Sequence, residues 1–110
     1  GRKALYSHKA GAPADEPLDE APGHVSGTIL IADDDEMVLN LCRTMVERIG
    51  YTVMTAADGD EAVRLFKEHS NEIICVILDL SMPKMDGMTA FDEIRLFRPD
   101  IKVIISSGYN

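Results

Sequence analysis

Acidic residues follow two separate apolar runs in this 110-residue sequence, and they are the residues that could do chemistry. The run at 73–78 leads directly into Asp79, and the run at 28–32 leads into Asp33 and Asp34. Short apolar runs that are rich in β-branched residues are typical of strands buried on both faces of a parallel sheet. Open α/β sheets bind ligands at the carboxyl ends of their strands. The three aspartates are therefore the candidate functional residues.

Carboxylates that are brought together repel one another, and at least one pKa in such a group rises. A divalent cation relieves the repulsion, and Mg²⁺ prefers one or two carboxylates together with water and phosphate oxygens. The acids therefore predict a half-built cation site that a phosphoryl group completes. The alternative is that Asp79 only caps a turn and that the acids at 33–36 only favour a helix N-terminus. That alternative explains Asp35 or Glu36, but not a third acid after a different strand.

The elements that must position these acids alternate regularly along the chain. Asp58 and Glu61 form a capping-box pattern before the second expected helix, and Pro99 blocks the third helix, which is expected over 88–97. The expected strands are 28–32, 51–56, 73–78 and 102–107. Apolar residues three and four apart predict a first helix with a buried face made of Val38, Leu41, Cys42, Met45, Val46 and Ile49.

Strict alternation of strands and helices with short loops predicts an α/β fold with a doubly wound parallel sheet and helices on both faces. In the flavodoxin-like order 2-1-3-4-5, the first and third strands are neighbours at the topological switch point. That order would bring Asp33, Asp34 and Asp79 within a few ångströms of one another. The sequence accounts for only four of the five strands.

The N-terminal residues differ in composition from the rest of the chain. Residues 1–27 are rich in Ala, Pro and Gly, and Pro13, Pro17 and Pro22 disfavour a regular helix. We interpret this segment as a linker or N-terminal extension that follows another domain, and residues 28–110 as one folded domain.

The net charge of −8 and the pI of about 4.7 argue against direct nucleic-acid binding, which requires a basic face. No apolar run reaches membrane-spanning length, so we expect no direct membrane contact and a cytoplasmic domain, although the parent chain could be membrane-anchored. Cys42 and Cys75 are expected to be free thiols in a reduced core. No glycine-rich phosphate loop is present, which argues against nucleotide cofactors.

Three stretches of the sequence resemble the receiver domains of two-component response regulators. They are Ile-Leu-Ile-Ala-Asp-Asp-Asp-Glu at 29–36, Leu-Asp-Leu-Ser-Met-Pro-Lys-Met-Asp-Gly at 78–87 and Ile-Ile-Ser-Ser-Gly-Tyr at 104–109. The pattern Asp-x-x-Met-Pro-x-Met-Asp-Gly at this distance from the acid pair is the specific feature. The resemblance covers residues 28–110 without a gap, and it implies the CheY-like form of the flavodoxin-like fold.

The resemblance implies a phosphorelay role, with Asp79 as phosphoacceptor for the phosphohistidine of a histidine kinase or a histidine phosphotransfer domain. It also implies Mg²⁺ bound by Asp79, by Asp34 directly, by Asp33 mainly through water, and by the backbone carbonyl of Ser81. Ser107 would hydrogen-bond the phosphoryl group. Such a domain is a signal-transduction switch that catalyses only its own Mg²⁺-dependent phosphorylation and dephosphorylation, and its parent could be a hybrid histidine kinase.

The sequence departs from the family at its C-terminal end. The family's fifth strand carries a Lys, and neither Lys84 nor Lys102 matches that position. We therefore expect a receiver that is truncated after the fourth strand. The fourth strand would then be a bare apolar edge, and such edges pair with other chains. We expect a homodimer or an exchange of elements through this edge.

Two other functions match the sequence less well. A degenerate receiver that only contacts other proteins would not need the complete set of acids together with Ser107. A phosphatase of the aspartyl-phosphate type would carry a second Asp two residues after the nucleophile, where this sequence has Ser81.

Overall fold

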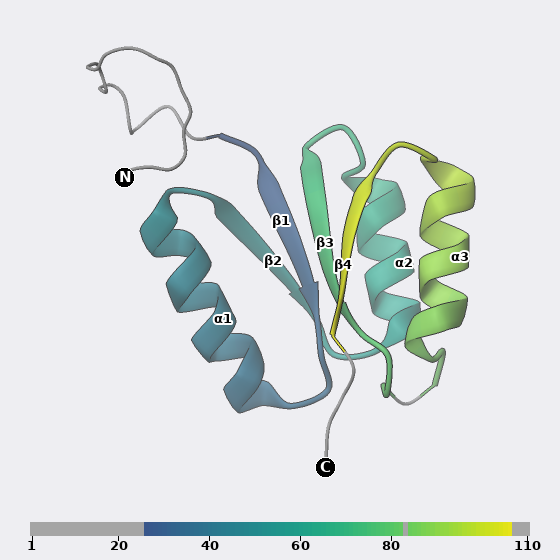
Figure 1. The fold of residues 1–110 in the computed structure, drawn as a ribbon, viewed down its shortest axis with the longest axis horizontal. Coiled ribbons are helices and arrows are strands. Elements are labelled where there is room, and N and C mark those ends of the chain that lie inside the picture. The colour runs from purple at the N-terminus through teal and green to yellow at the C-terminus, as the bar shows by residue number, and fades with distance from the viewer. Residues whose placement is uncertain (1–25, 83, 107–110) are drawn as a thin grey trace.

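The sheet is the element that positions the acidic residues. The computed structural model describes residues 26–82 and 84–106. In this part of the chain four strands form one parallel sheet in the order β2-β1-β3-β4 (Figure 1). Their bounds are Thr28–Ala32 for β1, Thr52–Ala56 for β2, Ile73–Asp79 for β3 and Lys102–Ser106 for β4. The predicted α/β fold, with the first and third strands as neighbours, is confirmed.

Two parts of the sequence-based interpretation fall on residues that the structure does not describe. An N-terminal extension is predicted for residues 1–27, and residues 1–25 of it lie outside the described ranges. Ser107 also lies outside them, and the last described residue is Ser106, at the end of β4.

Each described helix begins after an aspartate whose side chain accepts backbone N–H groups of the first turn. Asp35 caps α1 (Glu36–Ile49), Asp58 caps α2 (Gly59–Glu68) and Asp86 caps α3 (Gly87–Phe97). At α2 the Glu61 N–H donates to Asp58 at 2.8 Å, and the Glu61 carboxylate accepts from the Ala57 N–H at 2.9 Å. This is the predicted capping box, with its return bond one residue earlier than usual.

Helices cover both faces of the sheet (Figure 1). Under α2 and α3 lies the larger apolar cluster, which includes the fully buried Leu30, Phe66, Val76 and Ile94. Under α1 lies a smaller cluster of Ile29, Ile31, Leu39 and Cys75. The two clusters pack against opposite faces of β1 and β3. This explains why both strands have continuous apolar sequences. Both cysteines are free thiols, as expected.

The buried face predicted for α1 is wrong in part. Leu39 is the buried residue of this helix, and Cys42 and Val46 pack against the sheet beside it. The other four predicted members are exposed. Leu41 has 62% and Met45 54% of its surface exposed, and Val38 and Ile49 are exposed as well. A single helix on this face needs only a narrow stripe to cover β1 and β2, and no described element covers the rest of its apolar side. None of the helices in the described ranges is long and apolar enough to cross a membrane.

Candidate functional site

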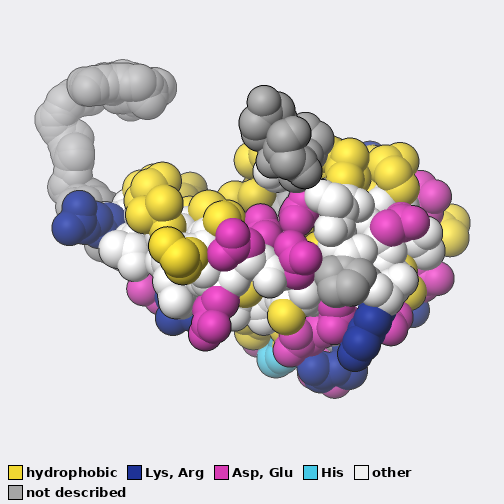
Figure 2. All heavy atoms as spheres, turned by 90° about the horizontal axis from the view of Figure 1, so that it is seen from below, with side chains coloured by type: hydrophobic (Ala, Val, Ile, Leu, Met, Phe, Trp, Pro, Cys, Tyr) yellow, Lys and Arg dark blue, Asp and Glu magenta, His cyan; other side chains and the backbone are white. Residues whose placement is uncertain are grey.

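The carboxyl ends of β1 and β3 place the acidic residues side by side. Ala32 at the end of β1 is in register with Leu78 of β3, so the next residues of the two strands, Asp33 and Asp79, emerge at the same edge. Both strands are buried on two faces, and the chain can place a charged group only where the strand leaves the core. Figure 2 shows acidic side chains gathered on the face that lies beyond these strand ends.

Asp33, Asp34 and Asp79 each offer one carboxylate oxygen, and these oxygens lie within 4.8 Å of one another. Asp79 is buried with 5% of its surface exposed, Asp33 is half-buried and Asp34 is exposed. The cluster is therefore closed on the protein side and open toward solvent at Asp34. Its donors are all oxygen, the set preferred by hard cations such as Mg²⁺, so the side chains fit such an ion.

The Asp79 carboxylate is held through one of its two oxygens. The Ser81 N–H donates to Asp79 Oδ1 at 3.1 Å, and the Ser81 hydroxyl lies 3.2 Å from the same oxygen. Among the described residues, every hydrogen bond to this carboxylate goes to Oδ1. Oδ2 therefore remains available to a ligand or a reacting group, while the bonds to Oδ1 fix the orientation of the side chain.

The loop after Asp79 returns close to the strand that it leaves. The Leu80 N–H donates to the Ser106 carbonyl of β4 at 3.0 Å, and the Gly87 N–H donates to the Leu80 carbonyl at 3.1 Å. A Cβ atom at Gly87 would lie 2.4 Å from the Asp79 carbonyl oxygen and 2.4 Å from the Leu80 Cα. Only glycine fits at this position, and its contact is with the backbone of Asp79 itself.

The pKa of the Asp33 carboxyl is raised from its ordinary value. Burial is the largest effect and raises its pKa; the nearby charges of Asp79 and Asp34 raise it further. A hydrogen bond from the Asp35 N–H, 2.8 Å long, offsets part of this rise. The repulsion predicted from the sequence thus contributes to the raised pKa of Asp33, but burial of the side chain contributes more.

Asp33→Asn is expected to stabilise the metal-free fold at neutral pH by about 0.5–2 kcal/mol. An acid with a raised pKa in the folded state binds its proton more tightly there, so its ionised form opposes folding as the pH rises through that pKa. The Asn oxygen still accepts the Asp35 N–H, so only the charge is lost. Urea unfolding in EDTA, at pH 7 and again near pH 4, measures the difference.

The matched control for this measurement is Asp92→Asn, which removes an exposed acid on α3. The stabilisation by Asp33→Asn should shrink toward zero as the pH falls to the ordinary aspartate range, about 3.9. A gain that is the same at both pH values, or that Asp92→Asn matches, would show that repulsion within the acidic cluster is not its cause.

The structure brings together the predicted residues Asp33, Asp34 and Asp79, and it places Ser81 beside Asp79. Ser107 lies outside the described residues, although its neighbour Ser106 is paired with Asp79 across β3 and β4.

The sequence reasoning missed two contacts of the loop after β3, and both involve the start of α2. The Lys84 ammonium lies 3.6 Å from the Asp58 carboxylate, and Gly59 lies against the backbone of Met85. The sequence has the pair Asp-Gly at 58–59 and again at 86–87. This likeness is a signal that could have pointed to Gly59.

Residues 29–110 match the family model described as the response regulator receiver domain. The sensor kinase CckA of Brucella abortus is 42% identical over 85 residues, which are 76% of this chain and 9% of that protein. The chemotaxis protein CheY of Treponema pallidum is 35% identical over 93 residues, which are 84% of this chain and 65% of that protein.

Among solved structures, the CheX–CheY complex of Borrelia burgdorferi with BeF3 and Mg²⁺ contains a similar chain. It aligns with a TM-score of 0.72 and 37% sequence identity, over 76% of this chain and 63% of that one. This chain thus spans less than two thirds of each of these three proteins. The residues matched by the family model, 29–110, include Asp33, Asp34 and Asp79.

Proposed function

Because this chain belongs to the response regulator receiver domain family, we propose that Asp79 accepts a phosphoryl group in a two-component phosphorelay. The donor is the phosphohistidine of a histidine kinase or a histidine phosphotransfer domain. The observation that carries this assignment is the position of Asp79: buried, held through Oδ1, and within 4.8 Å of two further carboxylates. Residues 28–110 are the receiver in this proposal, and residues 1–27 are an extension that precedes it.

The reaction that we propose is one displacement at phosphorus. Oδ2 of ionised Asp79 forms a bond to phosphorus, the bond from phosphorus to the histidine nitrogen breaks, and that nitrogen keeps the electron pair and is neutralised by a proton. Catalysis of this type depends on positioning and on neutralising charge. The hydrogen bonds from Ser81 to Oδ1 meet the first need, because they fix the side chain and leave the other oxygen without a hydrogen bond from the described residues.

Mg²⁺ is the cofactor of this proposal, with Asp33, Asp34, Asp79 and the Ser81 backbone carbonyl as its protein ligands. When bound, it supplies positive charge beside the transferring phosphoryl group. Two observations support this: the all-oxygen donor set, and the three carboxylate oxygens that lie within 4.8 Å of one another. The Mg²⁺ named with the Borrelia CheY complex belongs to that protein and supports the proposal by analogy.

Ser107 is proposed to donate a hydrogen bond to the phosphoryl group on Asp79. Support comes from β4, whose last residue, Ser106, is paired with Asp79. A phosphoryl group adds negative charge and acceptor oxygens, which can draw a nearby hydroxyl toward it. The rearrangement of the segment after β4 would switch the surface that a partner protein contacts.

The function is tested by intact-mass measurement on the full-length protein after incubation with acetyl phosphate. Addition of one phosphoryl group should require Mg²⁺ and should disappear when EDTA is present. If neither condition gives an adduct, and a histidine phosphotransfer domain also fails to transfer, a module that only contacts other proteins becomes the better interpretation.

The 110-residue chain is also expected to self-associate through β4. Among the strands of the described residues β4 is an edge of the sheet, and its residues Ile104 and Ile105 are exposed. Open edges with apolar side chains pair with further strands, and a charged residue on the edge opposes this. Light scattering should give about twice the monomer mass at high concentration, and Ile104→Lys should restore the monomer. If the 110-residue chain without the substitution is a monomer at that concentration, this association is ruled out.

A further inference from the structure

We propose that the first turn of α2 is a positioning element for the phosphoacceptor loop, with Gly59 as its central residue and the Asp58–Lys84 ion pair as a second tie. The loop connects β3 to α3, and the structure describes its residues 80–82 and 84–86. The inference rests on the proposed function, because it assigns to a neighbouring helix the task of holding Asp79 and Ser81 in place.

Gly59 lies directly against the backbone of this loop. A Cβ atom at Gly59 would lie 2.1 Å from the Met85 carbonyl oxygen and 2.8 Å from the Met85 carbonyl carbon. Cβ atoms do not come so close to backbone atoms, so any side chain at this position must displace backbone. Gly59 therefore sets the distance between the helix and the loop.

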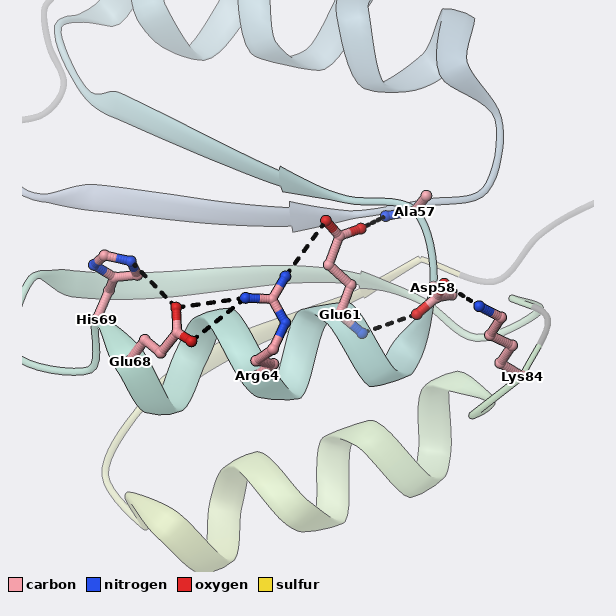
Figure 3. Close-up of polar contacts among 7 residues, drawn as sticks. All are labelled: Ala57, Asp58, Glu61, Arg64, Glu68, His69 and Lys84. Carbon is pink, nitrogen blue, oxygen red and sulfur yellow. Dashed lines mark hydrogen bonds and ion pairs between the residues drawn. The ribbon is translucent and has the colours of Figure 1, made fainter.

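A second contact joins the same two segments (Figure 3). The Asp58 carboxylate caps α2 through the Glu61 N–H at 2.8 Å and lies 3.6 Å from the Lys84 ammonium. Lys84 has a φ of 65°, a left-handed conformation that is costly for a residue with a side chain. Such a conformation persists where the surroundings hold it, and the two contacts from α2 adjoin Lys84: the ion pair at its own side chain and Gly59 at the next residue, Met85.

The loop, and not the helix, is the side that would yield. Helix α2 buries Ala62, Val63 and Phe66 in the main apolar cluster, so a shift of the helix would disturb the whole core. Among the described residues of the loop, Met82 is buried in that cluster, but Ser81, Lys84 and Asp86 are exposed, so the loop is less firmly held than the helix. A displaced Met85 would therefore move the loop relative to the sheet.

Movement of the loop would reach the reactive carboxylate. The loop starts directly at Asp79, and the Ser81 N–H and hydroxyl within it are the groups that hold Oδ1. Both the orientation of Asp79 and the position of the Ser81 carbonyl thus depend on where α2 holds the loop. A misplacement of a reacting group by about 1 Å can lower a reaction rate by about 100-fold.

The test is the rate of labelling by acetyl phosphate in the full-length protein, measured over a range of Mg²⁺ concentrations. Gly59→Ala is expected to lower the rate at saturating Mg²⁺ by about 10- to 100-fold and to raise the Mg²⁺ concentration for half-maximal rate. Asp60→Ala changes the next, exposed residue of the same turn and should label like the parent. Ile101→Ala is the control for lost stability. It truncates a buried side chain at the opposite end of the sheet, away from the loop.

A parent-like rate in Gly59→Ala would overturn the inference, as would an equal loss of rate in Ile101→Ala when both variants are folded. If Gly59→Ala does not fold, Lys84→Gln decides, because it removes the ion pair and keeps the side-chain length. It should raise the half-maximal Mg²⁺ concentration about two- to five-fold, the range of a partly exposed ion pair, and an unchanged value would overturn the inference. Absence of labelling in the parent would instead refute the proposed function.

Discussion

Asp79→Asn is expected to reduce phosphoryl labelling of the full-length protein to the background of the assay, a loss of at least about 1,000-fold. The substitution keeps the shape of the side chain, and the Asn oxygen still accepts the two hydrogen bonds from Ser81. It removes the ionised oxygen that attacks phosphorus, and an amide is a poor nucleophile. Because it also removes a buried charge, the variant should remain folded.

Asp35→Asn is the matched control for this prediction. Asp35 lies in the same acidic stretch but serves as the N-cap of α1, and Asn caps a helix about as well as Asp. The control should be labelled at close to the parental rate. Undiminished labelling of Asp79→Asn would mean that another residue carries the phosphoryl group.

Gly87→Ala is expected to impair both labelling and stability, and it is the second large effect. The added methyl group would lie 2.4 Å from the carbonyl oxygen of Asp79 and from the Cα of Leu80. The backbone of the phosphoacceptor must shift to relieve this contact. We expect a loss of labelling of about 100-fold and a decrease in the free energy of unfolding of about 1–3 kcal/mol, measured by intact mass and by urea unfolding.

Met88→Ala tests whether the effect is specific to position 87. Met88 is the next residue of α3, its side chain is exposed, and Ala is a good helix former. This variant should behave like the parent in both assays. If Gly87→Ala labels at the parental rate, the backbone contact between this glycine and Asp79 has no role in holding the reactive carboxylate.

Much of the site could be predicted from the sequence because it depends on local patterns and on strand order. Two apolar runs that each end in acids define two buried strands, and the switch point of the fold makes those strands neighbours. The meeting of Asp33, Asp34 and Asp79 follows from these two facts. The aspartate caps of the helices are local signals of the same kind.

Other features could not be predicted because they depend on what lies across from each residue. The spacing of apolar residues in α1 shows which of them share a face, but not how much of that face the sheet covers, and Leu41 and Met45 are exposed for this reason. The contact of Gly59 with Met85 joins residues 26 positions apart in the chain through the packing of a helix against a loop. The sequence marks Asp58-Gly59 only as a helix start.

The most direct test of the account is to locate the phosphoryl group in the full-length protein. The protein is labelled with acetyl phosphate and Mg²⁺ and cleaved at low pH, and its fragments are analysed by mass spectrometry. We expect the added mass in the fragment that contains Asp79, and we expect it to be absent when Mg²⁺ is withheld. Added mass on a histidine such as His69 or on a serine, with the Asp79 fragment unmodified, would contradict the central claim.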